Sequence, residues 1–166
     1  MKNIYSDDNT RAGIDDYTYQ MKDTIVQTPI GNLEIKIRKG KLTGLSWTKK
    51  AKTELKTESK KINKQLIQYF KGDRKKIEFP ITTNGTPFQK KVWKAISSIK
   101  YGKTTTYGHI AKKISSSPRA VGQAAKRNPL LILIPCHRVI AKNSLGGFLG
   151  KRGVRKKERL LRIEKN

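Results

Sequence analysis

Strand-like hydrophobic patterns come first along the chain. Residues 33–37 alternate apolar and polar side chains, which is the two-residue period of a half-buried β-strand. The strand-like segments 24–28 and 42–47 flank it, and short turns that contain glycine separate the three. Such closely spaced strands predict a small antiparallel sheet.

A helical period follows these strands. Between about Glu58 and Lys71, the apolar residues fall on one helix face, at Ile62, Leu66, Tyr69 and Phe70. We expect this face to cover the sheet. The lysine-rich connection over residues 49–61 predicts a solvated loop with no role of its own.

Residues 74–86 show the pattern of a linker, because Pro80 and the pair Asn84–Gly85 disfavour regular structure. Acidic residues also become rare beyond this point. The sequence therefore predicts a structural N-terminal α/β domain over residues 1–80 and a second domain over residues 81–166.

The second domain shows helical periods instead of strand periods. Thr86 followed by proline is a typical N-cap and first position for a helix over 87–99. Two shorter helices are predicted over 107–114 and 119–127, with Ser117 as the N-cap of the second, and a last one over 154–164.

Positive charge is concentrated in this second domain. The formal net charge of the chain is +26. Residues 1–80 hold 18 Lys and Arg against 10 Asp and Glu, whereas residues 81–166 hold 20 against 2. Such an excess predicts a polyanionic partner, DNA or RNA before a membrane. A soluble basic protein without such a partner is the alternative.

The two short helices are separated by a serine-containing turn, and the second opens with Arg119. This arrangement is typical of a helix-turn-helix, with an ordinary helical hairpin as the alternative. The predicted fold class is therefore α/β (α+β). It combines a small antiparallel sheet in the N-terminal domain with a helical C-terminal domain that carries a winged helix-turn-helix-like DNA-binding element.

The only cysteine, Cys136, lies in the stretch Ile134–Val139 beside His137, one of two histidines. A free thiol is mostly protonated at neutral pH, and a nearby imidazole is a common means of activating it. The apolar run Leu130–Ile134 predicts a buried strand or core segment that holds the site rigidly. The alternative is that Cys136 is inert filler of the core.

The rest of the composition excludes several classes of site. One cysteine allows no internal disulfide, which fits a reducing compartment. One cysteine and two histidines cannot fill a closed structural zinc site without carboxylates, so we expect no metal. The sequence also offers no cofactor site, and we expect no cofactor. Residues 1–8 lack the apolar core of a signal peptide, and no apolar run is long enough for a bilayer. We therefore expect a cytoplasmic protein with no membrane contact.

Short motifs of the second domain resemble one family. They are Gly85-Thr86-Pro87-Phe88-Gln89, Val92-Trp93, Tyr101-Gly102, Thr106-Tyr107-Gly108, Arg119-Ala120-Val121-Gly122, Asn128-Pro129 and Pro135-Cys136-His137-Arg138-Val139-Ile140. Over residues 85–164 the chain is similar to the methylated-DNA–protein-cysteine methyltransferases, also called O6-alkylguanine-DNA alkyltransferases. Residues 1–80 match only in general pattern, as a small sheet with a helix.

The resemblance implies a DNA repair protein that acts once. It would transfer methyl or alkyl groups irreversibly from O6 of guanine, and from O4 of thymine, to Cys136. His137 would act as the base through a bound water, and Glu164 would orient His137 and balance its charge. Asn128 would shape the turn before the cysteine, and Tyr107 would hydrogen-bond the flipped guanine.

The resemblance also implies a partner and the residues that contact it. A monomer would bind double-stranded DNA through the minor groove, with the alkylguanine flipped out of the stack and Arg119 filling the space it leaves. The DNA-binding residues would be Arg119, Ala120, Gly122, Tyr107, Arg127 and Arg138. The substrate pocket would be lined by Tyr107, Phe148, Leu149 and Lys157.

The sequence departs from the family pattern in three places. The turn before Arg119 is shorter than in many members. Phe148 stands where a tyrosine is common, so a hydroxyl contact is lost. The stretch Gly150–Gly153 is longer and more basic than usual.

Two other functions fit parts of the pattern. A non-catalytic binder of damaged DNA would carry a bulky residue in place of Cys136, and the cysteine is present. A cysteine hydrolase would turn over repeatedly and would need a donor for a tetrahedral oxyanion, which we cannot identify in the sequence.

Activation of the thiol by His137 calls for an acidic residue that pairs with the imidazole. Neighbours on an extended chain point to opposite sides, so a bridging water rather than a direct bond would link Cys136 to His137. A protonated His137 would also lower the thiol pKa, and it would need an anionic partner. Glu158 lies in a basic cluster, whereas Glu164 follows the packing residues of the last helix. We expect Glu164 to approach the core, the alternative being a frayed terminal charge.

Overall fold

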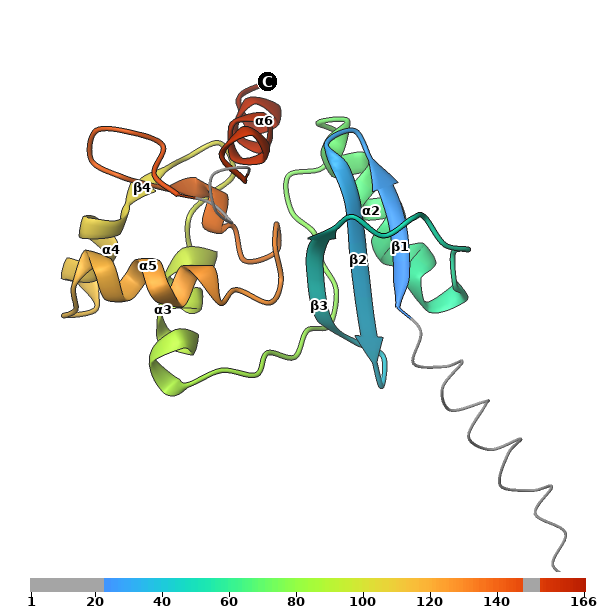
Figure 1. Ribbon diagram of the computed structural model, residues 1–166, viewed down its shortest axis with the longest axis horizontal. Coiled ribbons are helices and arrows are strands. Elements are labelled where there is room, and N and C mark those ends of the chain that lie inside the picture. The colour runs from blue at the N-terminus through green and yellow to red at the C-terminus, as the bar shows by residue number, and fades with distance from the viewer. Residues whose placement is uncertain (1–22, 148–152) are drawn as a thin grey trace, which may run out of the picture.

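The predicted antiparallel meander forms one side of the molecule (Figure 1). The computed structural model describes residues 23–147 and 153–166. The three strands, close to their predicted bounds, are β1 (Thr24–Thr28), β2 (Gly31–Arg38) and β3 (Lys41–Thr48). Gly40 closes the second turn with a φ of 72°, a left-handed conformation that glycine adopts without a Cβ clash.

A helix covers the sheet as the periodicity predicts. The 3₁₀ turn η1 (Thr57–Ser59) leads into α2 (Lys60–Phe70), which packs on the sheet in Figure 1. Ile62, Leu66 and Tyr69 are each 1% exposed or less. The helix therefore presents one apolar stripe to the core and its lysines to solvent.

The free edge of β3 binds two segments from elsewhere in the chain. Leu42 pairs with Ile81 of the linker, and Leu45 pairs with Leu130. The Leu45 amide donates to the Pro129 carbonyl at 2.9 Å, and the Leu131 amide donates to the Leu45 carbonyl at 3.0 Å. The segment that precedes Cys136 is thus attached to the sheet by backbone hydrogen bonds.

The sequence predicted either a buried strand or a core segment over Leu130–Ile134. The segment is buried, but it is not a regular strand. Leu130, Leu131 and Ile134 make isolated bridges around a turn. Ile132 lies in that turn with a φ of 75°, which is rare for a β-branched residue. The run is therefore a buried core segment with a strained turn.

The second half is helical, with caps where the sequence predicts them. Its helices are α3 (Pro87–Ser97), α4 (Tyr107–Lys113), α5 (Pro118–Lys126) and α6 (Val154–Lys165). Thr86 and Gln89 form a capping box at α3, and the Ser117 hydroxyl accepts from the Ala120 amide at α5. On α3, Phe88 is 38% exposed, whereas Trp93 lies in the core.

A short parallel pair joins the helical region to the cysteine. β4 (Thr105–Thr106) pairs with β5 (Val139–Ile140), which directly follows the 3₁₀ turn η2 (Cys136–Arg138). Because α4 begins immediately after β4, the pair places Cys136 beside the first residue of α4. The region after β5 contains residues 148–152, which lie outside the described residues, so the predicted wing stays a prediction.

The predicted fold class is confirmed, since a three-stranded antiparallel sheet combines with helices. Buried apolar residues of both halves form one cluster, and the division into domains at residue 80 stays a prediction. Over residues 23–147 and 153–166, no helix has the length and apolar character needed to cross a bilayer.

Gln65 fixes the linker on α2, which gives a test of this arrangement. Its side chain donates to the Glu78 carbonyl at 2.9 Å and accepts from the Glu78 amide at 2.7 Å. We predict that Gln65→Ala lowers the free energy of unfolding by about 1–2 kcal/mol, because two backbone groups lose their partner. Gln68 lies on the same helix and accepts one hydrogen bond from Arg74, which follows the helix, so Gln68→Ala should change the free energy of unfolding by less than about 0.5 kcal/mol. Urea denaturation measures both, and equal losses would contradict the assignment.

Candidate active site

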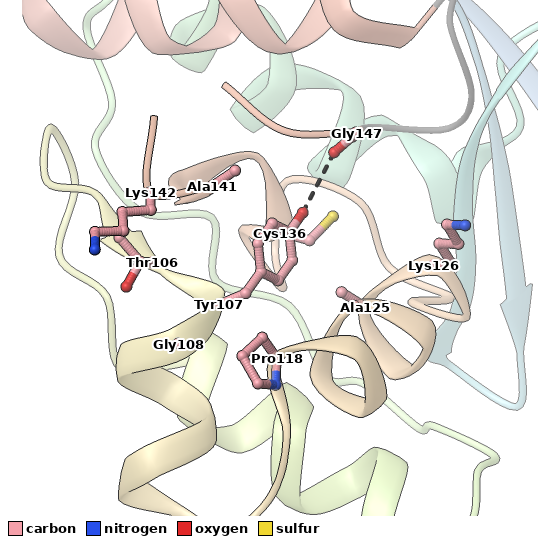
Figure 2. A pocket seen from close by; sticks show the side chains of 11 residues that line it. Thr106, Tyr107, Gly108, Pro118, Ala125, Lys126, Cys136, Ala141, Lys142 and Gly147 are labelled. Carbon is pink, nitrogen blue, oxygen red and sulfur yellow. Dashed lines mark hydrogen bonds between the residues drawn. The ribbon is translucent and has the colours of Figure 1, made fainter. Parts of the chain in front are cut away.

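Cys136 lies in the wall of a cavity of about 710 Å³. The residue is 6% exposed and opens η2. Figure 2 shows its sulfur beside the ring of Tyr107, with Pro118 and Ala125 of α5 across the cavity. The cavity therefore brings the thiol together with the two helices of the predicted helix-turn-helix.

Asn128 holds both the thiol and the chain around it. Its side-chain amide donates to the Cys136 sulfur at 3.2 Å and to the Ile134 carbonyl at 2.7 Å. Its side-chain oxygen accepts from the Leu130 amide at 2.9 Å. Asn128 thus shapes the turn, as expected, and also contacts the sulfur, a contact that the sequence analysis did not foresee.

The thiol is protonated in this resting structure. Burial raises the pKa of Cys136 to about 11, although the hydrogen bond from Asn128 and the charge of Lys157 act in the opposite direction. Burial also lowers the pKa of His137, which therefore is neutral at pH 7. The expected lowering of the thiol pKa by a protonated His137 is wrong for this state, because a fully buried imidazolium is too costly.

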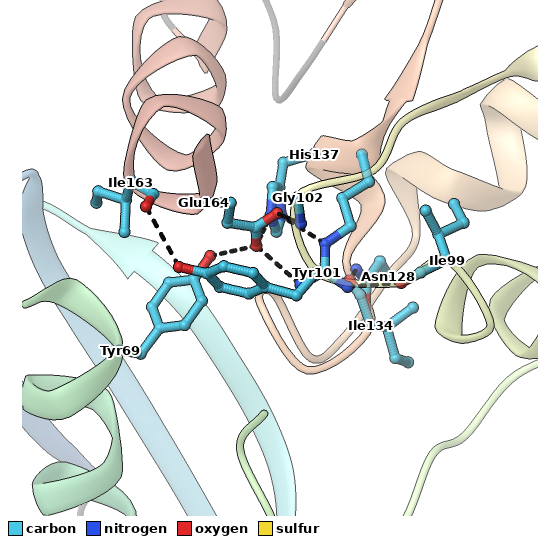
Figure 3. A network of polar contacts seen from close by, with 10 residues as sticks. Tyr69, Ile99, Tyr101, Gly102, Asn128, Ile134, His137, Ile163 and Glu164 are labelled. Atoms are coloured by element: carbon cyan, nitrogen blue, oxygen red, sulfur yellow. Dashed lines mark hydrogen bonds and ion pairs between the residues drawn. The ribbon is translucent and has the colours of Figure 1, made fainter. Parts of the chain in front are cut away.

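His137 turns away from the sulfur toward α6. The extended geometry expected for Cys136 and His137 is wrong, because both belong to the 3₁₀ turn η2. The His137 Nε2 lies 2.8 Å from Glu164 Oε1 (Figure 3). An ionised carboxylate only accepts hydrogen bonds, so Nε2 carries the proton and Nδ1 is the free base. Among the described residues, Nδ1 has no hydrogen-bond partner.

Glu164 lies in the core, as the sequence analysis expects, and is not a frayed charge. It is 4% exposed and lies on the same face of α6 as Leu160 and Leu161, whereas Glu158 is exposed. Burial alone would raise its pKa, but hydrogen bonds from His137 and Arg138 outweigh burial and hold the pKa at about 2. The carboxylate is therefore ionised at any working pH.

Arg138 binds this carboxylate, and its predicted contact with DNA needs correction. Its Nε and Nη2 donate to the two oxygens of Glu164 at 2.9 and 2.8 Å. Its Nη1 donates to the Ile99 carbonyl at 2.6 Å, and the residue is only 7% exposed. A guanidinium committed to buried acceptors in this way cannot reach a phosphate.

Two further residues, Tyr69 and Gly102, complete the carboxylate site and were missed by the sequence analysis. The Tyr69 hydroxyl donates to Glu164 Oε1 at 2.7 Å, and the Gly102 amide donates to Oε2 at 3.4 Å. Tyr69 lies on the predicted apolar face of α2. A tyrosine on such a face was the available signal, because its buried hydroxyl needs a partner.

Lys157 is fully buried near the thiol and acts on it electrostatically. Its Nζ donates to the Val139 carbonyl at 2.6 Å and the Gly147 carbonyl at 3.3 Å, and lies 5.8 Å from the ring centre of Tyr107. Burial lowers its pKa to about 8, against the opposing effect of Cys136. The Tyr107 hydroxyl donates to the Gly147 carbonyl at 3.3 Å. Tyr107 lines the cavity beside the thiol, whereas Lys157 is not among the described residues that line it, so its place in the pocket stays a prediction.

The helix α5 presents small and basic residues at the cavity entrance. Gly122 lines the cavity, and a Cβ there would meet no atom within 4 Å. Arg119 and Arg127, at the two ends of the helix, are exposed, and Ala120 is partly exposed. Phe148 and Leu149 lie outside the described residues, so their place in the pocket stays a prediction. Within the described residues, no group of His, Cys, Asp and Glu could hold a metal ion.

Comparisons with known proteins agree with this geometry. Residues 87–166 match the family model described as 6-O-methylguanine DNA methyltransferase, DNA binding domain. The chain is 42% identical over 143 residues to a constitutive methylated-DNA–protein-cysteine methyltransferase of Bacillus subtilis (strain 168), covering 78% of this chain and 87% of that one. A methylated-DNA–protein-cysteine methyltransferase of Archaeoglobus fulgidus is 44% identical over 105 residues, 61% of this chain and 71% of that one.

Solved structures are similar as well. The crystal structure of an O6-methylguanine methyltransferase from Mycobacterium tuberculosis superposes with a TM-score of 0.77 at 34% identity, covering 86% of this chain and 92% of that one. The crystal structure of Mycobacterium tuberculosis OGT in complex with DNA gives a TM-score of 0.74 at 35% identity, covering 85% and 91%.

The protonated resting thiol is directly measurable, because the chain has one cysteine. We predict that thiolate absorbance at 240 nm, with Cys136→Ser as the blank, rises with a midpoint near pH 11, where burial places the pKa. A midpoint at or below that of a free thiol, about 8.5, would contradict the assignment.

Proposed function

The chain belongs to the family of methylated-DNA–protein-cysteine methyltransferases, and on this basis we propose that it repairs DNA by moving an alkyl group from O6 of guanine to Cys136. The observation that carries the proposal is the position of the single thiol, in a cavity lined by both α4 and α5. A flipped base that enters beside α5 would meet this thiol.

The transfer is a displacement at saturated carbon. The sulfur forms a bond to the alkyl carbon while the bond from that carbon to O6 breaks. The electron pair of the broken bond leaves with the guanine, which takes up one proton as the thiol gives up one, and Tyr107 would hydrogen-bond the base. No tetrahedral oxyanion forms, so the reaction needs no oxyanion hole. A cysteine hydrolase would need such a donor, and the sequence analysis identified none, so alkyl transfer is favoured.

The thiol must lose its proton as the bond forms, and His137 is the proposed acceptor. Its Nδ1 is buried without a partner among the described residues, and buried acceptors of this kind are satisfied by ordered water. A water between Sγ and Nδ1 would carry the proton to His137, and Glu164 would stabilise the imidazolium that results. Lys157 would favour the developing thiolate electrostatically.

The proposed partner is double-stranded DNA, approached by α5 at the minor groove with the alkylguanine flipped out. Small residues at Ala120 and Gly122 allow the backbone of α5 to come close to the duplex. Arg119 would fill the space that the base leaves, which offsets the cost of a few kcal/mol for extrusion. Arg127 would contact phosphate. The same pocket would accept alkylated O4 of thymine.

Further features of the proposal follow from the chemistry or from the sequence. A thioether has no easy route back to a thiol, so each chain would act once. We also predict a monomeric state and a cytoplasmic location. The division into a variable N-terminal domain over 1–80 and an alkyl-acceptor domain over 81–166 likewise remains a prediction.

The stoichiometry of transfer tests the proposal. After incubation with excess duplex that contains O6-methylguanine, mass spectrometry should find one added methyl per chain, on the peptide with Cys136. Cys136→Ala should gain none and should still bind the duplex, because the substitution leaves α5 unchanged. Multiple turnovers at a low ratio of protein to DNA would reject the single-turnover reaction and favour a hydrolase.

Extrusion of the base gives a separate test. Arg119→Ala should slow single-turnover transfer from duplex by ~10-fold or more and leave transfer from free O6-methylguanine base unchanged, because only the duplex requires extrusion. Lys61→Ala, which removes an exposed cation on α2, is the control for charge alone. If Arg119→Ala lowers the transfer rate equally for the duplex and for the free base, the residue has a structural role instead.

A further inference from the structure

Tyr69 reaches the active site from the other half of the chain. It lies on α2, 95 residues before Glu164 in sequence, and its hydroxyl donates to Glu164 Oε1 at 2.7 Å (Figure 3). The residue is 1% exposed. Its ring makes edge-to-face contacts with Phe70 and Tyr101, at centroid distances of 5.5 and 6.2 Å. The direction of the hydroxyl is therefore fixed by packing.

Three donors share the one carboxylate oxygen. Besides Tyr69, the His137 Nε2 lies 2.8 Å from Oε1 and the Arg138 Nη2 lies 2.8 Å from it. A carboxylate offers about four lone-pair sites over its two oxygens, so three donors on one oxygen compete for electron density. Each bond that Oε1 accepts weakens its hold on the others. A stronger bond from Tyr69 therefore means a weaker bond from His137.

We propose that Tyr69 is a positioning residue that sets the basicity of His137 through Glu164. By taking part of the charge on Oε1, the hydroxyl keeps the imidazole a weak base, so that it is neutral at rest and holds the thiol proton only during transfer. In this way the N-terminal half, whose described residues contribute no side chain to the cavity, would control the chemistry of the thiol. The role in catalysis rests on the proposed function, whereas the coupling to His137 does not.

Other charged groups near His137 act on its protonation as well. Lys157 from α6 and Arg138 from η2 disfavour the protonation of His137, whereas Glu164 favours it. Tyr101, in the turn after α3, lies near Glu164 but gives its hydroxyl to the Ile163 carbonyl at 3.2 Å. Burial and the neighbouring Glu164 raise the pKa of Tyr69, so its hydroxyl stays protonated and remains a donor throughout the working pH range.

Tyr69→Phe removes the competing donor and little else. Histidine labelled with ¹⁵N in the ring gives only two imidazole spectra, and the exposed His109 serves as an internal reference. We expect the Nε2 signal of His137 to move and its pKa to rise by about half a unit, a ~threefold change in its protonation constant. The acid limb of the single-turnover rate profile should move to higher pH by the same amount, since protonated His137 cannot accept the thiol proton.

Tyr101→Phe is the matched control, because it removes a neighbouring hydroxyl and leaves all three donors on Oε1. It should leave the His137 signals in place. Tyr69→3,5-difluorotyrosine, introduced at this site alone, makes the hydroxyl a stronger donor and should lower the pKa of His137. This variant keeps every packing atom, so it tests the coupling even if Tyr69→Phe folds poorly.

Two results would overturn the coupling: unchanged His137 signals in both Tyr69 variants, or an equal shift in Tyr101→Phe. The spectra require no alkyl transfer. If the His137 shifts occur but no variant, nor the parent chain, accepts a methyl group, the proposed function fails while the coupling stands.

Discussion

The burial of one carboxylate constrains the whole arrangement around the thiol. An ionised group that is removed from water is costly unless several donors replace its hydration. Glu164 receives five hydrogen bonds from the described residues, donated by α2, η2 and the turn after α3. The carboxylate links these elements by accepting hydrogen bonds from all of them. Its burial in turn depends on those donors, because they replace its hydration. The same bonds fix the ring of His137, so the geometry of the base follows from the solvation of its partner.

This constraint also explains the resting charge state. Because the carboxylate is already satisfied by Arg138 and Tyr69, it does not need a protonated His137, and burial keeps the imidazole neutral. Burial keeps the neighbouring thiol neutral as well. The thiol would therefore keep its proton until the alkyl group is transferred and the guanine departs with the electron pair. A thiolate in the same apolar wall would be strongly basic and open to oxidation, whereas a neutral thiol beside a neutral imidazole is neither.

Local patterns predicted most of the elements, and tertiary contacts account for the rest. The three strands, α2 and the caps of α3 and α5 follow from periodicity and from Thr86 and Ser117, which act within a few residues. Arg138 shows the limit of sequence reasoning. The family resemblance implied that it contacts DNA, and only the position of Glu164, distant in sequence, reveals that its guanidinium is buried. The turn at Ile132 likewise follows residues that pair with β3, a long-range contact that local propensity does not encode. Glu164 was predictable because it shares one helix face with apolar residues.

The N-terminal half acts on the site in two physically different ways. The edge of β3 holds the segment before Cys136 through backbone groups of Leu45, and such bonds are largely indifferent to the side chains on the strand. Tyr69 acts through one hydroxyl, which no apolar residue of similar shape can replace. The sheet could therefore change much of its sequence and still position the thiol, whereas loss of that single oxygen would alter the charge distribution on Glu164. Under the proposed coupling, the N-terminal half would therefore take part in the proton transfer through the contact of Tyr69 with Glu164, although its described residues do not line the cavity.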